Sequence, residues 1–223
     1  MNAIQPQDSS TLAQGSREWH QAKLGKFSSS GVHALMGTEK AATTYIYKVA
    51  AERNLKEKYR DEYLNEYIRR TSASSKAMEY GKDNEDLART TYMMKTGNRV
   101  VQCGFVDHPE IPYFGDSPDG IILNEVGCPV SALEIKCPNP DTFLRYRSAL
   151  RSGVSLKELE LKYYWQCITH IMCNNVAYCD FVIFDKMQKG FLHIERIDRD
   201  EFECTQLRMA VERANERIKK ILN

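Results

Sequence analysis

The order in which helical and strand patterns follow one another is the feature that most limits the fold of this chain. Helical spacing dominates residues 17–96, strand patterns follow over 99–137, and a long helix, two more strands and a last helix complete the chain. Helices that precede and follow strands in this way need a sheet to pack against. The sequence therefore predicts an α/β or α+β fold, with helices flanking a mixed central sheet.

The individual elements are predicted from apolar spacing and from turn residues. The closing helix, for example, repeats apolar residues at spacings of three and four from Leu207 to Ile221. Pro138 and Pro140 are predicted to end the third strand. Helices are expected over 32–36 (with N-caps among the serines at 28–30), 41–70, 74–96, 156–174 and 200–222, and strands over 99–106, 113–123, 130–137, 176–184 and 191–197.

Composition favours one globular domain in a reducing compartment. The chain has 223 residues, of which 42% are hydrophobic, and it contains no apolar run long enough to span a membrane. Residues 1–16 are polar, without the apolar stretch of a secretory signal, and are predicted to be a flexible leader before a single domain at 17–223. Seven cysteines without a Cys-x-x-Cys pair argue against a disulfide framework and favour the cytoplasm.

Charge is balanced overall but not along the chain. The net charge is +1, which excludes a highly basic tail-type nucleic-acid binder. Residues 17–76, however, carry twelve Lys or Arg against seven Asp or Glu. A solvated helix face explains much of this excess, and a surface that faces phosphates is the alternative.

The segment from Gly115 to Lys136 contains the residues most suited to chemistry. On a strand, Glu134 and Lys136 share one face while Ile135 points to the other. A hairpin would place Asp119 beside Glu134 on the neighbouring strand. Two adjacent carboxylates repel each other unless a cation lies between them, and their oxygens suit Mg²⁺ or Mn²⁺. An ammonium on the same face can approach a phosphoryl oxygen or a water molecule, which is the D…(D/E)-x-K arrangement of metal-dependent nucleases.

Two simpler interpretations accompany these patterns. An Asp and a Glu-x-Lys that recur by chance would be a surface charge pair. Cys167, His170 and Cys173 stand at i, i+3 and i+6, where a metal cluster is conceivable. They are interpreted instead as one face of a buried helix, because zinc ligands usually come in closely spaced pairs.

Five motifs in order strengthen the nuclease interpretation. They are WHQAKLG (19–25) followed by SSSGV (28–32), YGKDNEDLART (80–90), SPDG (117–120), LEIKCP (133–138) and YYWQ (163–166). Together they resemble the phage lambda exonuclease (YqaJ-type) family of viral recombination nucleases, from about Trp19 to the last helix. The resemblance implies a restriction-endonuclease-like core of the PD-(D/E)XK superfamily.

The resemblance also assigns the catalytic residues. In that family the Asp of SPDG, the acid of the E-x-K strand and the carbonyl between them bind metal, which corresponds here to Asp119, Glu134 and Ile135. Lys136 positions the water and stabilises charge. Glu85 belongs to the metal and water network, and Gln166 lies near the active site. A second Gln that the family often carries is replaced here by Ile168. The structural alternatives are a solvated helix residue for Glu85 and a surface amide for Gln166.

Three further residues are assigned to DNA by the same resemblance. Lys23 and Ser30 match the family's pocket for a 5′-terminal phosphate, with Lys in place of the family's Arg, so that a point charge replaces a bidentate fork. The alternative is a surface cation and an N-cap. Met78 aligns with an apolar residue that the family uses as a wedge between the DNA strands, and core packing is equally expected.

The function implied is a Mg²⁺-dependent 5′→3′ exonuclease on double-stranded DNA, with two Mg²⁺ ions per site for which Mn²⁺ can substitute. It would release 5′-mononucleotides by in-line attack of water and leave 3′ single-stranded tails for recombination. The expected partners are DNA with a 5′-phosphorylated end and a single-strand annealing protein, and the expected assembly is a homotrimeric ring. Enclosure of DNA by a ring would also account for the low net charge.

Two other functions remain open from the sequence. An endonuclease of restriction or repair type could use the same catalytic core. A DNA-binding module without catalysis could retain the fold, although the presence of Asp119, Glu134 and Lys136 argues against it.

Overall fold

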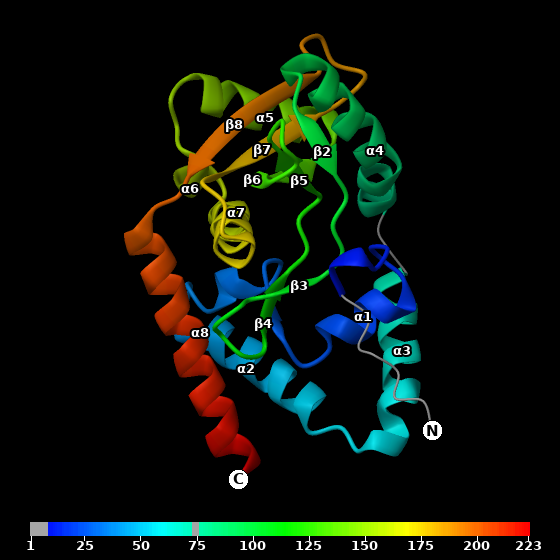
Figure 1. The fold of residues 1–223 in the computed structure, drawn as a ribbon, viewed down its shortest axis with the longest axis vertical. Helices are drawn as coiled ribbons and strands as arrows, with labels where there is room; N and C mark the ends of the chain where they lie inside the picture. The colour runs from blue at the N-terminus through cyan, green and yellow to red at the C-terminus, as the bar shows by residue number, and fades with distance from the viewer. Residues whose placement is uncertain (1–8, 73–75) are drawn as a thin grey trace.

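A five-stranded mixed sheet forms the centre of the protein (Figure 1). The structure is a computed structural model that describes residues 9–72 and 76–223. The strand order is β2-β5-β6-β7-β8, with β6 and β7 parallel and the other neighbours antiparallel. The predicted mixed sheet is therefore confirmed. Its strands are β2 (Arg99–Val101), β5 (Gly120–Leu123), β6 (Pro129–Lys136), β7 (Tyr178–Phe184) and β8 (Leu192–Asp198).

A helical crossover joins the two parallel strands, because β6 and β7 cannot be connected by a tight turn. Its first helix is absent from the sequence prediction, in which two prolines only end a strand. The signal for it is Asn139, whose side chain accepts a hydrogen bond from the Thr142 N–H at 3.2 Å, followed by Pro140 at the first helical position. The helix predicted over 156–174 is divided at Glu160, whose backbone is not helical (φ −154°, ψ 86°). The crossover helices are α5 (Pro140–Arg151), α6 (Leu156–Leu159) and α7 (Leu161–Asn174).

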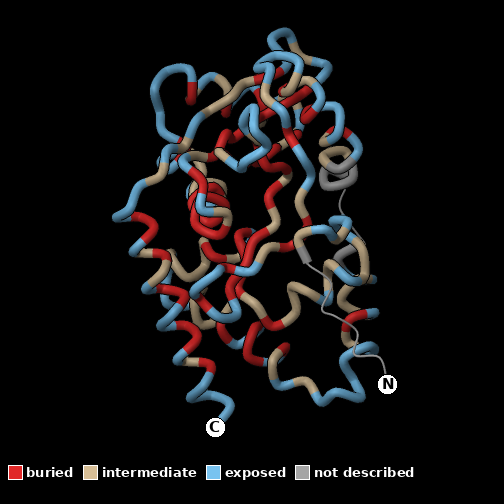
Figure 2. Tube along the Cα trace, in the orientation of Figure 1, coloured by how far each residue is buried: buried red, intermediate tan, exposed pale blue. Residues whose placement is uncertain are grey.

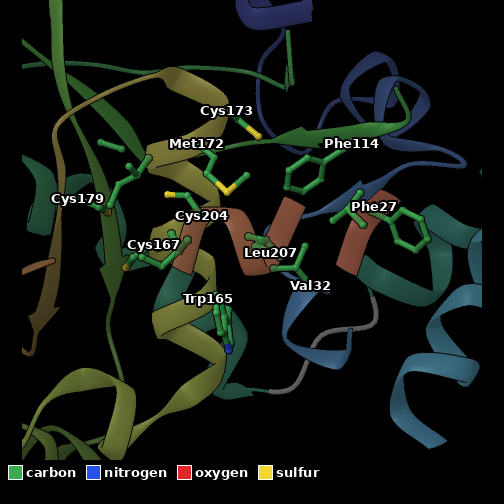
Figure 3. Packing of buried hydrophobic residues seen from close by; sticks show 14 of the residues in the cluster. Phe27, Val32, Phe114, Trp165, Cys167, Met172, Cys173, Cys179, Cys204 and Leu207 are labelled. Carbon is green, nitrogen blue, oxygen red and sulfur yellow. The ribbon is translucent and has the colours of Figure 1, made fainter. Parts of the chain in front are cut away.

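Helices cover both faces of the central sheet. On one face α4 (Lys76–Thr96) places Ala88 and Tyr92 against the side chains of β2, β5, β6 and β7. On the other face lies α7, which is buried from Cys167 to Cys173 (Figure 2). Its side chains pack against α8 (Glu201–Leu222), where Cys204 and Leu207 lie close to Trp165 and Cys167 (Figure 3). The apolar spacing predicted for the closing helix is thus confirmed as a core contact from Leu207 to Ile218, whereas Ile221 is exposed.

A second, three-stranded sheet lies beside the first, in the order β1-β4-β3. Its presence corrects two predictions, because the strands expected over 99–106 and 113–123 each divide between the two sheets. Pro118 lies at the second division, where a residue without an N–H cannot continue a ladder of hydrogen bonds. The strands of the second sheet are β1 (Phe27–Ser28), β3 (Val106–Asp107) and β4 (Phe114–Asp116).

The N-terminal third is helical, as predicted, but is divided differently. The helix expected over 41–70 is interrupted near Asn54, which is the C-cap of the first part. The helix expected over 32–36 is a 3₁₀ turn at Val32–Ala34 whose N-cap is Gly31 rather than a serine, so no side chain caps it. The helices of this region are α1 (Arg17–Lys23), α2 (Glu39–Arg53) and α3 (Arg60–Ser72), with further 3₁₀ turns at Ser9–Thr11 and Glu57–Tyr59.

The described part of the predicted leader is attached to the domain. The Gln14 side chain donates hydrogen bonds to the carbonyl oxygens of Cys103 at 2.9 Å and Pro118 at 2.7 Å. Ser16 caps α1 through the Trp19 N–H at 3.1 Å. Residues 1–8 lie outside the described part of the chain. Over residues 9–72 and 76–223, no helix is long and apolar enough to cross a membrane.

The seven cysteines all carry free thiols. Five of them are buried, whereas Cys103 is partly accessible and Cys128 is exposed in the turn between β5 and β6. The absence of a disulfide framework, predicted from the cysteine count and spacing, agrees with these free thiols.

Candidate active site

Two carboxylates meet where β5 begins beside the end of β6. The antiparallel register pairs Gly120 with Leu133, so Asp119, the residue before β5, comes next to Glu134. The Asp119 Oδ2 accepts a hydrogen bond from the Ile135 N–H at 2.7 Å. The structure thus brings together the two side chains that the hairpin was expected to place side by side.

The alternation of β6 places the charged residues on one face of the sheet. Glu134 is fully buried, and its Oε1 forms an ion pair with the Lys136 ammonium. The Lys136 Nζ also lies 5.2 Å from the centre of the Tyr163 ring on α7. Ile135, between them, packs in the core under α4. The predicted division of the Glu-Ile-Lys segment between two faces is therefore confirmed.

Burial and charge set the protonation of this group. Burial, and then the charge of Glu134, raise the pKa of Asp119 to about 8, although Lys136 opposes the rise. Burial alone would raise the pKa of Glu134, but the Lys136 charge and the hydrogen bond from His170 together lower this pKa to about 2. Burial alone would lower the pKa of Lys136, but the charges of the two carboxylates outweigh the effect of burial and raise that pKa above its usual value. The ammonium is accordingly charged at neutral pH.

The donor set fits a divalent cation. Burial and the charge of Glu134 both disfavour ionisation of Asp119, and a cation between the two carboxylates would offset that cost. Each carboxylate oxygen has two lone pairs, so the hydrogen bonds already made leave lone pairs for a metal. Over residues 9–72 and 76–223, no three His, Cys, Asp or Glu side chains are placed to hold a metal ion. Two neighbouring carboxylates supply the hard oxygen ligands that suit Mg²⁺.

Helix α4 contributes an acid and an arginine at the edge of the site. The Glu85 Oε1 accepts a hydrogen bond from Arg89 Nη2 at 2.6 Å, and Arg89 Nε donates to the Asp119 carbonyl at 3.0 Å. Burial raises the pKa of Glu85, with the charges of Lys136 and Glu134 close enough to act on it. Glu85 is therefore placed beside the carboxylate pair. The part of Arg89, which ties α4 to the loop before β5, was not foreseen from the sequence.

One face of α7 borders the same site. Tyr163, Gln166 and His170 follow at spacings of three and four, so they share a face of the helix. Tyr163 lies against Lys136, and His170 contacts Glu134, with Gln166 half-buried between them. The structure thus places Gln166 on the face that lines the site. Ile168 is fully buried in the core.

His170 is the residue that the sequence analysis underestimated. Its neighbours at i−3 and i+3, Cys167 and Cys173, are core residues as expected. The histidine itself bridges two buried carboxylates, with Nε2 at 2.7 Å from Glu134 Oε2 and Nδ1 at 2.7 Å from Asp116 Oδ1. The spacing of the three residues predicted the buried face, but it held no signal for carboxylates 54 and 36 residues away.

A small cavity with basic walls lies between α1, β1 and α2. It has a volume of about 80 Å³, and both residues assigned to the 5′-phosphate pocket, Lys23 and Ser30, line it. Lys48 and Lys26 add positive charge, although Lys26 is paired with Asp107 at 2.6 Å. The remaining lining residues are His20, Leu24, Ser28, Tyr45, Val49, Glu52 and Tyr67.

Lys23 is a half-buried cation of this cavity. Its ammonium lies 3.8 Å from the centre of the Trp19 ring. Burial lowers the pKa of Lys23 to about 8, with Asp116 opposing and Lys48 reinforcing the shift. Ser30 Oγ lies 3.4 Å from Ser28 Oγ at the exposed side. The helix expected to begin after Ser30 is only a 3₁₀ turn, with Gly31 as its N-cap.

The motif SPDG is attached to the N-terminal helix. Trp19 Nε1 donates a hydrogen bond to Ser117 Oγ at 2.9 Å, and Ser117 Oγ donates to the Gly104 carbonyl at 2.9 Å. Trp19 therefore positions this loop, and its ring connects the basic cavity to the loop of Asp119. The side chain of Met78 lies outside the described residues, so the predicted wedge is not placed.

Comparisons with known proteins agree with this arrangement. The family model of the YqaJ-like viral recombinase domain matches residues 18–177. The alkaline exonuclease LHK-Exo from Laribacter hongkongensis is 26% identical over 93% of this chain and 94% of that chain, with a TM-score of 0.74. Its complex with dAMP gives a TM-score of 0.75 at 26% identity, with the same 93% and 94% coverage. A phage-related exonuclease from Haemophilus somnus, 12% identical over 91% of this chain and 97% of that chain with a TM-score of 0.57, shares the fold. No curated protein matches the chain.

Proposed function

The chain belongs to the family of YqaJ-like viral recombinase domains, and on that basis we propose that it is a nuclease, specifically a Mg²⁺-dependent 5′→3′ exonuclease on double-stranded DNA. It would release 5′-mononucleotides and leave 3′ single-stranded tails for recombination by strand annealing. The observation that carries the proposal is the placement of Asp119, Glu134 and Lys136 side by side on neighbouring strands. The similarity of nearly the whole chain to an alkaline exonuclease supports it.

Each residue of the site has a part in this proposal. The metal ligands would be Asp119, Glu134 and the Ile135 carbonyl, and the site would bind two ions. When bound, Mg²⁺ supplies Lewis-acid activation of water and neutralises charge on the phosphoryl group. The Lys136 ammonium orients the attacking water and stabilises negative charge on the phosphoryl oxygens. Glu85 accepts hydrogen bonds from water at the same site.

Linear and circular duplexes separate the proposed exonuclease from its rivals. The exonuclease is expected to release acid-soluble nucleotide from linear duplex with Mg²⁺ and to leave covalently closed circles intact. An endonuclease of the same core would nick the circles, and a binding module would cut neither form. A duplex labelled at one 5′ or one 3′ end fixes the direction, because the 5′ label is expected to be released first. Chelation of the metal should stop release in every case.

The basic cavity supports recognition of a 5′-terminal phosphate. We expect Lys23→Ala to reduce the preference for 5′-phosphorylated over 5′-hydroxyl duplex by roughly 10-fold or more, because a charged hydrogen bond is worth about 1.5–3 kcal/mol. The measurement is kcat/KM on both duplexes, with Lys40→Ala, an exposed lysine of α2, as the matched control. Equal rates on the two ends for the wild type would rule out a phosphate pocket.

The proposal extends to assembly and partners. A homotrimeric ring that encloses DNA, working with a single-strand annealing protein in the cytoplasm, is supported by the family and by the net charge of only +1. Enclosure retains an enzyme on DNA without strong neutralisation of phosphates. Sedimentation at micromolar concentration is expected to give three times the chain mass of 25.7 kDa. A monomer under those conditions would contradict the ring.

A further inference from the structure

A buried histidine joins the candidate metal site to a carboxylate outside it. Glu134, His170 and Asp116 are each 0% exposed. His170 Nε2 lies 2.7 Å from Glu134 Oε2, and His170 Nδ1 lies 2.7 and 2.8 Å from the two oxygens of Asp116. Both ring nitrogens therefore contact carboxylates, which leaves neither nitrogen for a contact with the reacting phosphate.

The three residues come from three different elements. Asp116 ends β4 in the small sheet, Glu134 lies on β6 in the central sheet, and His170 projects from α7 between them. Asn174, one turn further along α7, donates a second hydrogen bond to Asp116 Oδ2 at 3.0 Å. Asp116 is thus held by two side chains of one helix, which fixes the plane of the imidazole.

Such an arrangement is expensive unless the orientation of Glu134 matters. Burying charged groups costs more than packing apolar residues of similar volume, and replacement of buried ion pairs by apolar residues is often stabilising. The Glu134 Oε1 is held by Lys136 and its Oε2 by His170, so rotation of the carboxylate would break both interactions. The lone pairs that remain on the two oxygens therefore keep fixed directions. Groups outside the metal ligands fix ligand orientation in this way in many metal sites.

We propose that His170 is a positioning residue, anchored by Asp116 and Asn174, that sets the orientation of the Glu134 carboxylate for a divalent metal. This inference rests on the proposed function, because it requires a metal between Asp119 and Glu134. It assigns a role to Asp116, which the nuclease motifs do not use.

Two conservative variants separate the two hydrogen bonds of the imidazole. His170→Asn keeps a donor near the Nδ1 position, toward Asp116, but is too short to reach Glu134. His170→Gln extends an amide to the Nε2 position and can still bond Glu134. Thr169→Val is the matched control, because Thr169 is equally buried on α7 and its hydroxyl bonds only the Trp165 carbonyl of its own helix, at 2.8 Å.

The experiment titrates the protein with Mn²⁺ alone, by calorimetry or by electron paramagnetic resonance, without DNA. We expect His170→Asn to bind Mn²⁺ roughly 10- to 100-fold more weakly than the wild type, the usual effect of losing an outer partner of a ligand. His170→Gln and Thr169→Val should remain within about 3-fold of the wild type. Thermal unfolding of each variant without metal reports stability separately. Should His170→Asn fail to fold, Asp116→Asn removes the anchor more gently and is expected to weaken Mn²⁺ binding in the same direction.

The outcomes distinguish this inference from the proposed function. If the wild type binds Mn²⁺ and His170→Asn binds it with the same affinity, the positioning role is overturned and the metal site stands. The same conclusion follows from Asp116→Asn if that variant is the one that folds. Equal losses in His170→Asn and His170→Gln also overturn it, because the bond to Glu134 would then not be what matters. A wild type that binds no Mn²⁺ overturns the metal site itself and the inference with it.

Discussion

Asp119→Asn is expected to abolish Mg²⁺-dependent DNA cleavage, with a loss of at least about 10³-fold, while leaving the protein no less stable than the wild type. Cleavage fails because one of the two charged metal ligands is lost. The fold survives because the Asn oxygen can still accept the hydrogen bond from the Ile135 N–H. Stability does not fall because burial and Glu134 disfavour the charge at position 119, so a neutral side chain removes a repulsion.

The sign of the stability effect can be checked against pH. The pKa of Asp119 in the fold, about 8, lies above that of an unfolded aspartate, so ionisation of this group destabilises the wild type as pH rises from about 4 to 8. Without metal, the melting temperature of Asp119→Asn should therefore gain on the wild type over that interval. Asp198→Asn, an exposed position at the end of β8, is the control for both measurements. Substantial cleavage by Asp119→Asn would refute the metal site.

Lys136→Met is expected to lower the rate of cleavage by about 10²-fold or more while DNA and Mn²⁺ still bind. The methionine keeps the apolar stem of the side chain but removes the ammonium that the carboxylates hold in its charged form. The measurement is single-turnover cleavage beside equilibrium binding of a duplex in Ca²⁺. Parallel loss of DNA binding and turnover would make Lys136 a phosphate anchor instead.

A matched control for Lys136 exists in the same neighbourhood. The Lys162 ammonium also lies near the Tyr163 ring, at 5.9 Å from its centre, but on an exposed side chain of α7. Lys162→Met removes a cation from the same ring without touching either carboxylate. Its cleavage rate should remain within about 3-fold of the wild type, since surface charges have small effects.

The strand of the candidate site was predictable because its information is local. Glu134 and Lys136 share a face through simple alternation along β6, and a hairpin is enough to bring Asp119 beside them. Motif order then extended the prediction to Gln166 on α7. The first two steps need only neighbouring residues or a single turn, whereas the assignment of Gln166 came from the resemblance to the family.

The rest of the site depends on contacts that no local pattern records. The bonds from His170 to Asp116 and Glu134 span 54 and 36 residues, and they form only because α7 crosses from one sheet to the other. The division of residues 113–123 between two sheets was missed although Pro118 marked it. Pro138 and Pro140 were predicted only to end a strand, whereas Asn139 and Pro140 begin α5.

The segment from Gly115 to Asp119 passes from the small sheet to the central sheet and limits the distance between the basic cavity and the candidate metal site. Ser28, which lines the basic cavity, pairs with Gly115 of β4. Asp119, one of the two carboxylates of the candidate metal site, follows only four residues after Gly115. Four residues span at most roughly 14 Å, and the first of them belong to a hydrogen-bonded strand. Under the proposed function, the backbone of this segment would set the distance between a DNA end bound in the basic cavity and the phosphate that is cut at the metal site. Product length would then resist side-chain substitution and change only with insertions or deletions between Gly115 and Asp119.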